Sequence, residues 1–336
     1  MQREQFPIKF KFPKLPKQNR VANPCSGIDD KENGLIIMAK IVSIKTAREL
    51  LKEYELSELH AAINYISAFS GKRFVLKIGG SVLNDPSLLP YFVKDVIFLK
   101  KVGISIVLVH GGSRQLTEAM TKNNLQVQYI RGLRVTSAEV LELAAKVFSE
   151  ISHDIENEIE KHGYHSQIFG RETGLVKSEQ IDIPELGFVG VPRTVEVSLL
   201  NNLAENVIPI VSSVTAGIKT CDIGFNVNAD DVAGIIASKI GAEKLILMTD
   251  VDGVLDEKGN LLSSLTVSQV EQLIAKKVIH SGMIPKVETC LTALKNGVQK
   301  CHIVKGSKHS FIEEILTDEG VGTEIFKDEF ANQFAN

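Results

Sequence analysis

The sequence lacks the features of disulfide-stabilised proteins and of cysteine-bound metal sites. Its 336 residues include four cysteines, with no C-x-x-C spacing among them. Thiols scattered in this way argue against a disulfide framework and fit a reducing compartment. We therefore expect a cytoplasmic protein and assign no metal ligands. The four cysteines are Cys25, Cys221, Cys290 and Cys301.

The chain also lacks an excess of one charge and a long apolar run. Its formal net charge is −3, so it has no general electrostatic attraction to nucleic acid or to an anionic membrane. The longest mostly apolar runs are about six residues, as in Ile104–Val109. A membrane-spanning helix needs roughly 20 such residues. We expect neither nucleic acid nor membrane as a partner, and 44% hydrophobic residues suit a globular core.

The N-terminal segment has little periodic pattern. Residues 1–36 lack the apolar core of a secretory signal, so we interpret residues 1–37 as a disordered extension. Met38 opens the first periodic segment and is an alternative start of the protein. Residues 38–71 predict N-terminal amphipathic interaction helices, which end at Gly71. Their apolar face packs either on their own domain or on another subunit.

From residue 72 onward, apolar strands alternate with amphipathic helices. The stretches "FVLKI" and "SIVLV" are apolar on both faces, as in central parallel strands. The alternation predicts an α/β fold, a three-layer sandwich with a central, mostly parallel sheet, over residues 72–328. Thr136 and Glu139 predict a capping box that opens a long helix, which ends at Gly163. Ligands bind at the carboxyl ends of parallel strands, so the residues that follow strands are the informative ones.

Four polar or glycine-rich segments follow predicted strands. They are residues 77–81, 110–113, 226–231 and 249–253. Paired glycines at a strand end let backbone N–H groups approach an anion, and a following helix N-terminus adds positive potential. One such pair ends many ordinary strands. Two pairs after consecutive strands, the first beside a lysine, favour a phosphate or carboxylate site.

Two lysines and one aspartate are candidates for phosphoryl-transfer chemistry, which needs positive charge and positioning more than covalent catalysis. Lys77 ends a strand, and Lys286 begins a helix after Gly282, although either alone could be an ordinary solvated lysine. Asp230 can hold both ammonium groups, or it can interact with a helix dipole. Arg134, at a loop–helix junction, suits bidentate capture of a carboxylate, although a surface salt bridge is the commoner role.

The order of these segments resembles the amino-acid kinase family. The resemblance runs from about Leu59 to Phe326 and rests on "KIGG", "VLVHGG", "GLRVT", "NVNADDVA", "LMTDVDGVLD", "SGMIPKVET" and "TDEGVGTEI". It implies ATP-dependent phosphorylation of the γ-carboxylate of N-acetyl-L-glutamate in arginine biosynthesis, with Mg²⁺ arriving on the ATP. It also implies two lobes, residues 72–220 for the acceptor substrate and residues 221–328 for the nucleotide.

The resemblance assigns roles to individual residues. Three would be catalytic, with two ammonium groups on the transferring phosphoryl group and one carboxylate that organises both: Lys77, Lys286 and Asp230. Four would bind the acceptor through backbone N–H groups, at its α-carboxylate and at its N-acetyl end: Gly111, Gly112, Arg134 and Asn226. Eight would bind the nucleotide: Gly79, Gly80, Asp250, Val251, Gly253, Leu255, Gly282 and Met283.

Both ends of the chain resemble the arginine-inhibited members of the family. The segment "AAINYISAFSGKRFVLK" resembles a helix that interlaces dimers into a hexameric ring. We therefore expect L-arginine as a feedback inhibitor and a homodimer or a hexamer as the assembly. A PII-type signalling protein is a further candidate partner. The residues that match the arginine site are Tyr65, His302, Glu314 and Gly320.

Two departures from the family pattern concern the acceptor side. The second glycine loop continues with Ser113 and Arg114, where the family has a third glycine and often a proline. Residues 164–197 keep little of a glycine-rich family stretch. Two alternatives follow. The chain could phosphorylate another N-acylated amino acid, such as N-acetyl-aminoadipate, or act as a non-catalytic, arginine-sensing regulatory subunit.

Overall fold

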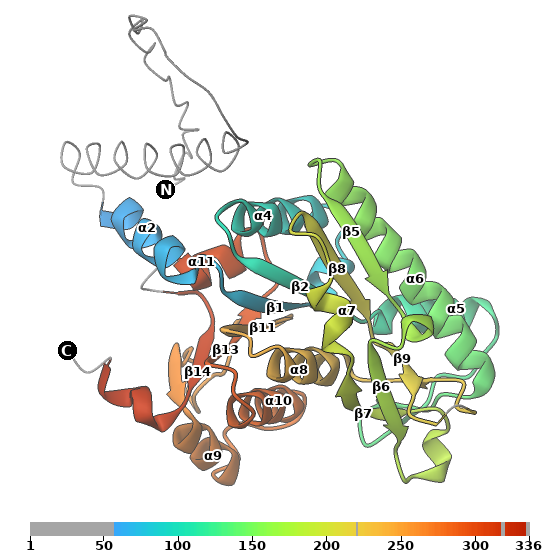
Figure 1. Cartoon of the computed structure of the whole chain (residues 1–336). Helices are drawn as coiled ribbons and strands as arrows, with labels where there is room; N and C mark the ends of the chain where they lie inside the picture. Colours follow the sequence, from blue (N-terminus) through green and yellow to red (C-terminus); the bar gives the residue numbers. More distant parts are fainter. Residues whose placement is uncertain (1–56, 220, 317–319, 334–336) are drawn as a thin grey trace, which may run out of the picture. The chain divides into compact units, whose positions relative to one another are not determined.

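The computed structural model describes residues 57–219, 221–316 and 320–333 (Figure 1). The extension predicted over residues 1–37, the alternative start at Met38 and the helical pattern before residue 57 lie outside the described residues. The end of that pattern is α2 (Ser57–Phe69), and Gly71 follows it with a φ of +82°. Residues with a side chain rarely adopt this backbone, so glycine suits the turn into the first strand.

An eight-stranded sheet forms the centre of this part of the molecule. Its order is β12-β14-β13-β11-β1-β2-β8-β5, and every neighbouring pair is parallel except β13 and β14. The predicted mostly parallel sheet is therefore confirmed. The strands are β1 (Arg73–Ile78), β2 (Ser105–His110), β5 (His165–Phe169), β8 (Val207–Ser212), β11 (Lys244–Thr249), β12 (Ser264–Thr266), β13 (Lys300–Lys305) and β14 (Thr323–Phe326).

Helices cover both faces of this sheet (Figure 1), which gives the predicted three layers. One buried core joins the sheet to α4 (Leu89–Lys101), α5 (Ser113–Lys122), α6 (Ala138–Glu160) and α11 (Ser310–Leu316). The other joins it to α8 (Ala229–Lys239), α9 (Val267–Ala275) and α10 (Met283–Lys295). Among the described residues, none of the helices has the combination of length and apolar character that a bilayer crossing requires.

The alternation of side chains along β1 determines which layer Lys77 faces. Successive strand residues point to opposite faces of a sheet. Phe74 and Leu76 lie in the core shared with α4 and α6, whereas Val75 lies in the core shared with α8 and α10. Lys77 is two residues after Val75, so its side chain points toward the layer of α8 and α10.

A second, four-stranded sheet occupies much of the region in which the sequence shows little regular pattern. Its order is β10-β9-β6-β7, and its strands are β6 (Val176–Gln180), β7 (Gly190–Val195), β9 (Val214–Gly217) and β10 (Phe225–Asn226). These strands are short, and many of their residues are exposed, so their apolar signal is weak. The remaining short elements are β3 (Tyr129–Ile130), β4 (Leu133–Arg134), α3 (Gly80–Leu83), α7 (Val197–Asn201), η1 (Arg171–Thr173), η2 (Pro184–Leu186) and η3 (Asp328–Gln333).

The predicted capping box of α6 is wrong, because the helix is capped by the residue after Thr136 and, among the described residues, has no reciprocal Glu139 contact. Ser137 is the N-cap, and its hydroxyl accepts a hydrogen bond from the backbone N–H of Val140 at 3.2 Å. Thr136 is fully buried, and its hydroxyl donates to the Arg134 carbonyl at 2.9 Å and accepts from the Asn226 side chain at 3.2 Å. Thr136 therefore joins β4 to β10 instead of capping the helix.

Candidate active site

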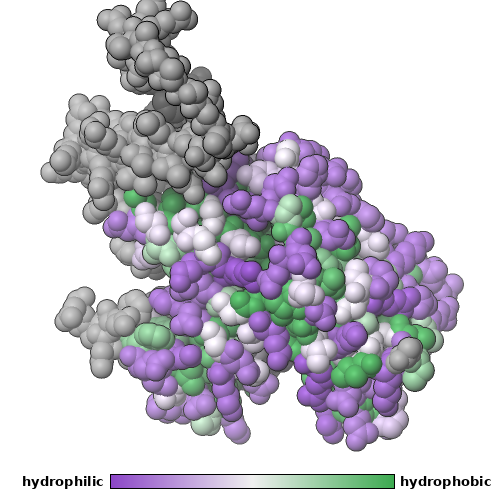
Figure 2. All heavy atoms as spheres, in the orientation of Figure 1, coloured by the Kyte–Doolittle hydropathy of each residue, from purple (hydrophilic) through white to green (hydrophobic). Residues whose placement is uncertain are grey.

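A cavity of about 1660 Å³ opens between the layer of α8 and α10 and the second sheet. The surface is hollowed between the part that carries α10 and the part that carries β7 (Figure 2). The cavity reaches the carboxyl ends of β1 and β2, the sheet edge at which ligands bind in this class of fold. The predicted site residues on its wall are Lys77, Gly80, Gly111, Gly112, Arg134, Asn226, Asp230 and Gly282.

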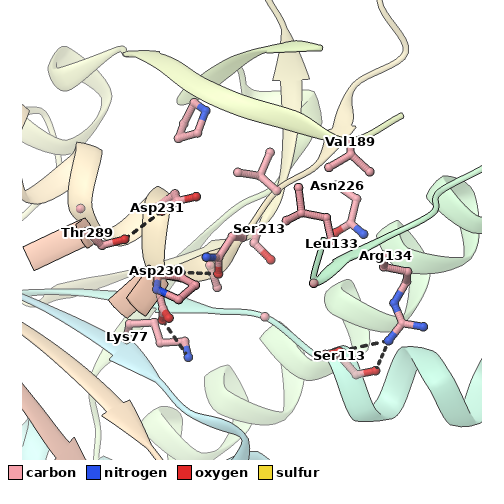
Figure 3. Close-up of a pocket in the computed structure, with 18 of the residues that line it drawn as sticks. Lys77, Ser113, Leu133, Arg134, Val189, Ser213, Asn226, Asp230, Asp231 and Thr289 are labelled. Carbon is pink, nitrogen blue, oxygen red and sulfur yellow. Dashed lines mark hydrogen bonds and ion pairs between the residues drawn. The ribbon is translucent and has the colours of Figure 1, made fainter. Parts of the chain in front are cut away.

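Two lysines meet one buried aspartate beside this cavity (Figure 3 draws Lys77 and Asp230). Lys77 comes from the end of β1, Asp230 from the first turn of α8 and Lys286 from the first turn of α10. The Lys77 Nζ lies 2.9 Å from Asp230 Oδ1, and the Lys286 Nζ lies 2.8 Å from Oδ2. The Asp230 side chain is only 6% exposed, so each carboxylate oxygen holds one ammonium group in a largely dry setting.

The two ammonium groups keep Asp230 ionised despite its burial. Burial alone raises the pKa of a carboxyl group, but the charges and hydrogen bonds of Lys77 and Lys286 outweigh that effect and lower the pKa of Asp230 to about 2. The N-cap of α8, Asn228, accepts a hydrogen bond from the backbone N–H of Asp230 at 3.2 Å and fixes this turn. At neutral pH the cluster therefore contains two positive charges and one negative charge.

The turn after β2 presents backbone to the cavity. A Cβ added to Gly112 would lie 2.5 Å from Ile151 Cδ1 and 2.8 Å from Phe148 Cε1, both on α6. A Cβ on Gly111 would lie 3.3 Å from the Cβ of Ala229, the first residue of α8. Side chains of α6 and α8 thus crowd this turn, and without side chains of their own the two glycines leave their backbone N–H groups unshielded.

Arg134 lies across the cavity from this cluster, with its guanidinium beside α5 (Figure 3). Its Nη2 donates to the Ser113 carbonyl at 2.8 Å, the Ser113 hydroxyl at 3.0 Å and the Thr117 hydroxyl at 2.7 Å. Arg134 is 6% exposed, and no carboxylate of the described residues lies within ion-pair distance of it. Burial lowers the pKa of Arg134, but a guanidinium keeps its charge at neutral pH. Such a group fits an anionic ligand.

Asn226 and its neighbours complete the wall near Arg134. Asn226, Leu133 and Val189 lie close together beside Arg134 (Figure 3). Ser213 and Val189 also line the cavity, and we did not predict either from the sequence. Ser213 follows β8 directly, so the strand-end argument could have found it. Val189 lies between a 3-10 helix and β7, where the sequence carries no such signal.

Several predicted nucleotide residues do not line this cavity. Gly79 packs against β11, because a Cβ there would lie 2.3 Å from the Met248 carbonyl oxygen. Gly253 has a φ of +154°, and a Cβ there would lie 2.6 Å from the Thr323 hydroxyl. Val251 and Leu255 are 40% and 39% exposed on the segment after β11. The predicted nucleotide residues absent from the cavity wall are Gly79, Asp250, Val251, Gly253, Leu255 and Met283.

A separate buried polar cluster contains the predicted effector residues His302 and Glu314. The His302 Nδ1 lies 2.8 Å from Glu314 Oε1, and the Lys244 Nζ lies 2.8 Å from His302 Nε2. Burial and the Lys244 charge lower the pKa of His302, so Nδ1 donates to Glu314 while Nε2 accepts from Lys244. Burial also lowers the pKa of Lys244, to about 8, although Glu324 at 3.8 Å opposes this shift.

The other two predicted effector residues lie near this cluster. Gly320 has a φ of +59°, and a Cβ there would lie 2.8 Å from Glu314 Oε2. Tyr65 lies on α2 and stacks on Phe69 with the ring centroids 6.0 Å apart. The Lys244 ammonium lies 5.0 Å from the centroid of the Phe69 ring. Three of the predicted residues therefore meet at one buried cluster away from the Lys77 cavity, and Tyr65 approaches it through Phe69.

Comparison with known proteins places the chain in a family. The model of the amino acid kinase family matches residues 72–305, which is most of the chain. The chain belongs to the amino acid kinase family. An acetylglutamate kinase of Aquifex aeolicus is 42% identical over 287 residues, which cover 80% of this chain and 96% of the relative. One of Methanococcus vannielii is 39% identical, with 83% of this chain and 100% of the relative covered.

Solved structures share the amino acid kinase fold. N-acetylglutamate synthase from Neisseria gonorrhoeae, complexed with coenzyme A and N-acetyl-glutamate, matches with a TM-score of 0.72 and 24% identity. The match covers 81% of this chain but only 63% of that longer chain. Carbamate kinase from Giardia lamblia bound to AMP-PNP matches with a TM-score of 0.61 and 14% identity, and it covers 77% and 99% of the two chains.

As an amino acid kinase, the chain uses ATP. The acidic side chains at the cavity are not arranged to coordinate a Mg²⁺ ion of their own. Both oxygens of Asp230 already hold ammonium groups, and Asp231 accepts a hydrogen bond from the Thr289 hydroxyl at 2.8 Å. Within the described residues, no three His, Cys, Asp or Glu side chains are grouped so as to bind a metal ion. These residues do not fit a dedicated Mg²⁺ site.

Proposed function

We propose that this chain is an acetylglutamate kinase that transfers the γ-phosphoryl group of ATP to the γ-carboxylate of N-acetyl-L-glutamate, a step of arginine biosynthesis. An acceptor oxygen bonds to the γ-phosphorus as the bond to the ADP oxygen breaks, and the products are an acyl phosphate and ADP. The curated relatives with this name support the proposal because they match over nearly their full length. The observation that carries it is the pair of lysines on Asp230.

The lysine pair provides what phosphoryl transfer requires. The migrating group carries dispersed negative charge, so catalysis depends on fixed positive charge and alignment. Asp230 fixes both ammonium groups before substrates bind. Because one carboxylate balances only one of the two ammonium groups, the three-residue cluster keeps a net positive charge. We assign Lys77 and Lys286 to the transferring phosphoryl group and Asp230 to positioning them.

The opposite wall suits the acceptor. The Arg134 guanidinium has no carboxylate partner among the described residues, so we assign it to the α-carboxylate of N-acetyl-L-glutamate. Asn226 lies beside it and is assigned to the N-acetyl end. Gly111 and Gly112 line the same cavity, and we assign their backbone N–H groups to the reacting end of the acceptor, where the phosphoryl group is transferred. Mg²⁺ would enter on the phosphates of ATP, as phosphoryl transfer generally requires.

The direct test is ADP release by the purified chain with ATP, Mg²⁺ and a panel of acceptors that includes N-acetyl-L-glutamate and N-acetyl-aminoadipate. Lys77→Ala should lower kcat/KM by about 10²–10³-fold, the effect of removing one electrostatic group. Lys72→Ala is the matched control, because Lys72 pairs with Glu243 at the surface, and it should stay within threefold of wild type. If the protein phosphorylates N-acetyl-aminoadipate but not N-acetyl-L-glutamate, the assigned acceptor is wrong. If wild-type protein releases no ADP with any acceptor, the proposed kinase activity is refuted.

We further propose that L-arginine inhibits the enzyme at the cluster around His302 and Glu314. Glu314 Oε2 accepts backbone hydrogen bonds from Val321 and Gly322, each at 2.8 Å, and so holds the C-terminal segment against β13. A guanidinium ligand would find a carboxylate there. Inhibition of ADP release by millimolar L-arginine, lost in Glu314→Gln, is the expected result. The homodimer, the hexamer and a PII-type partner stay predictions, as does the cytoplasmic location.

A further inference from the structure

His110 is a fully buried histidine at the end of β2, immediately before the two glycines of the cavity wall. Its Nδ1 lies 2.9 Å from the carbonyl oxygen of Gly111, and its Nε2 lies 2.7 Å from the hydroxyl of Ser152 on α6. A carbonyl oxygen can only accept a hydrogen bond, so Nδ1 carries the proton and donates it. The Ser152 hydroxyl then donates to Nε2.

This pair of contacts fixes the peptide plane between Gly111 and Gly112. In a trans peptide the carbonyl and the following N–H point in opposite directions within one plane. The Gly111 carbonyl is held on the side of His110 and α6. The N–H of Gly112 therefore points away from α6, and Gly112 lines the cavity. Within the described part of the chain, no backbone or side-chain acceptor contacts that N–H.

Helix α6 packs closely against the turn. The rings of Phe148 and His110 meet edge to face, with an interplanar angle of 68° and centroids 6.3 Å apart. Ile151 and Phe148 leave no space for a side chain at Gly112. One stretch of α6, residues 148–152, thus supports both the histidine and the glycine that follows it. Burial lowers the pKa of His110 to about 4, so the ring stays neutral in any ordinary assay and its tautomer is constant.

We propose that His110 is a positioning residue that aims the Gly112 N–H at the transferring phosphoryl group. The inference rests on the proposed kinase function, which places a phosphoryl group between the lysines and the acceptor. A backbone donor held in advance toward developing charge stabilises a transition state without reorganisation. His110 never touches the substrate and acts through the peptide that it holds.

Two nearly isosteric variants separate the contributions of the two ring nitrogens. In His110→Asn the amide N–H can occupy the place of Nδ1–H and keep the bond to Gly111, whereas in His110→Gln it lies nearer the place of Nε2. We expect His110→Gln to lower kcat about 10²-fold, the scale of one lost oxyanion donor, with KM for both substrates within threefold. His110→Asn should retain at least tenfold more kcat than His110→Gln. Melting temperatures of both variants establish that they are folded.

A binding measurement tests the same geometry without turnover. Wild-type protein should bind MgADP more tightly when aluminium fluoride, a mimic of the phosphoryl group, is added, and His110→Gln should lose this gain while binding MgADP alone normally. Equal kcat losses in the two variants, or a full fluoride gain in His110→Gln, would overturn the positioning role. Wild-type protein that shows the gain but turns over no acceptor would leave the positioning role standing and refute the proposed function.

Discussion

Replacing Asp230 by asparagine tests whether the lysine pair needs its carboxylate. The side chain keeps its shape and loses its charge, while Lys77 and Lys286 keep their places in the sequence. At an effective dielectric constant near 20, each contact at 2.8 or 2.9 Å carries about 6 kcal/mol of Coulomb energy before desolvation is counted. The pKa of about 2 implies a net preference for the ionised form of only about 2 kcal/mol. Burial therefore offsets most of the attraction.

Without the carboxylate, two ammonium groups face each other in a largely dry site. One of them should move toward solvent, and this movement removes a positive charge from the transferring phosphoryl group. We expect kcat/KM to fall by about 10²–10³-fold, the scale of one lost electrostatic group.

The assay is ADP release at neutral pH, with Asp231→Asn as the matched control. Asp231 is the neighbouring acid on the cavity wall, and it contacts the Thr289 hydroxyl instead of a lysine. The same charge change there should cost less than tenfold. If Asp230→Asn keeps the wild-type rate, or if both variants lose activity equally, the carboxylate does not organise the lysines.

Three further predictions follow from other contacts. Thr117→Val removes one of the hydroxyl groups that hold Arg134. In steady-state kinetics the KM for the acceptor should therefore rise about tenfold with kcat unchanged. This rise corresponds to a loss of about 1.4 kcal/mol of binding free energy, which is typical of a hydrogen bond to a charged group. Burial lowers the pKa of His110 from 6.5 to about 4, so its contribution to stability is complete above pH 6.5 and lost as the pH falls toward 4. Between pH 7 and pH 5, urea unfolding of wild type should lose about 2 kcal/mol more than that of His110→Asn; equal losses would refute the burial argument. His302→Asn should raise the L-arginine concentration needed for half inhibition in the ADP-release assay, while activity without arginine stays within threefold of wild type.

Much of the site could be predicted because parallel strands bring distant residues to one edge. Lys77 and His110 end neighbouring strands, and Asp230 begins a helix that packs on them. Their closeness follows from the sheet topology, so the positions of the strand ends in the sequence were enough to predict that these residues share a site. The partners of Arg134 could not be predicted in this way, since Ser113 and Thr117 are ordinary helix residues whose orientation depends on how α5 packs.

The cap of α6 and the burial of Lys244 could not be predicted from the sequence pattern, because tertiary contacts override local preferences. Thr136 and Glu139 fit a capping box, but the buried bond between Thr136 and Asn226 engages the hydroxyl elsewhere and leaves Ser137 as the cap. Lys244 opens an apolar strand and looks like a solvated strand end, yet it is 3% exposed and contacts His302. A buried charge is visible only once its partners, far away in the sequence, are in place.

The central place of β1 in the sheet has a consequence for how the chain is made. β1 pairs with β2 on one side and with β11 on the other, and β11 begins at Lys244. During synthesis at about 5–20 residues per second, the edge of β1 that receives β11 stays unpaired for on the order of ten seconds or more. An apolar strand with an open edge can pair with the same strand of another nascent chain. Folding of this protein is therefore most exposed to aggregation, and most open to help from chaperones, while β11 is still to be made.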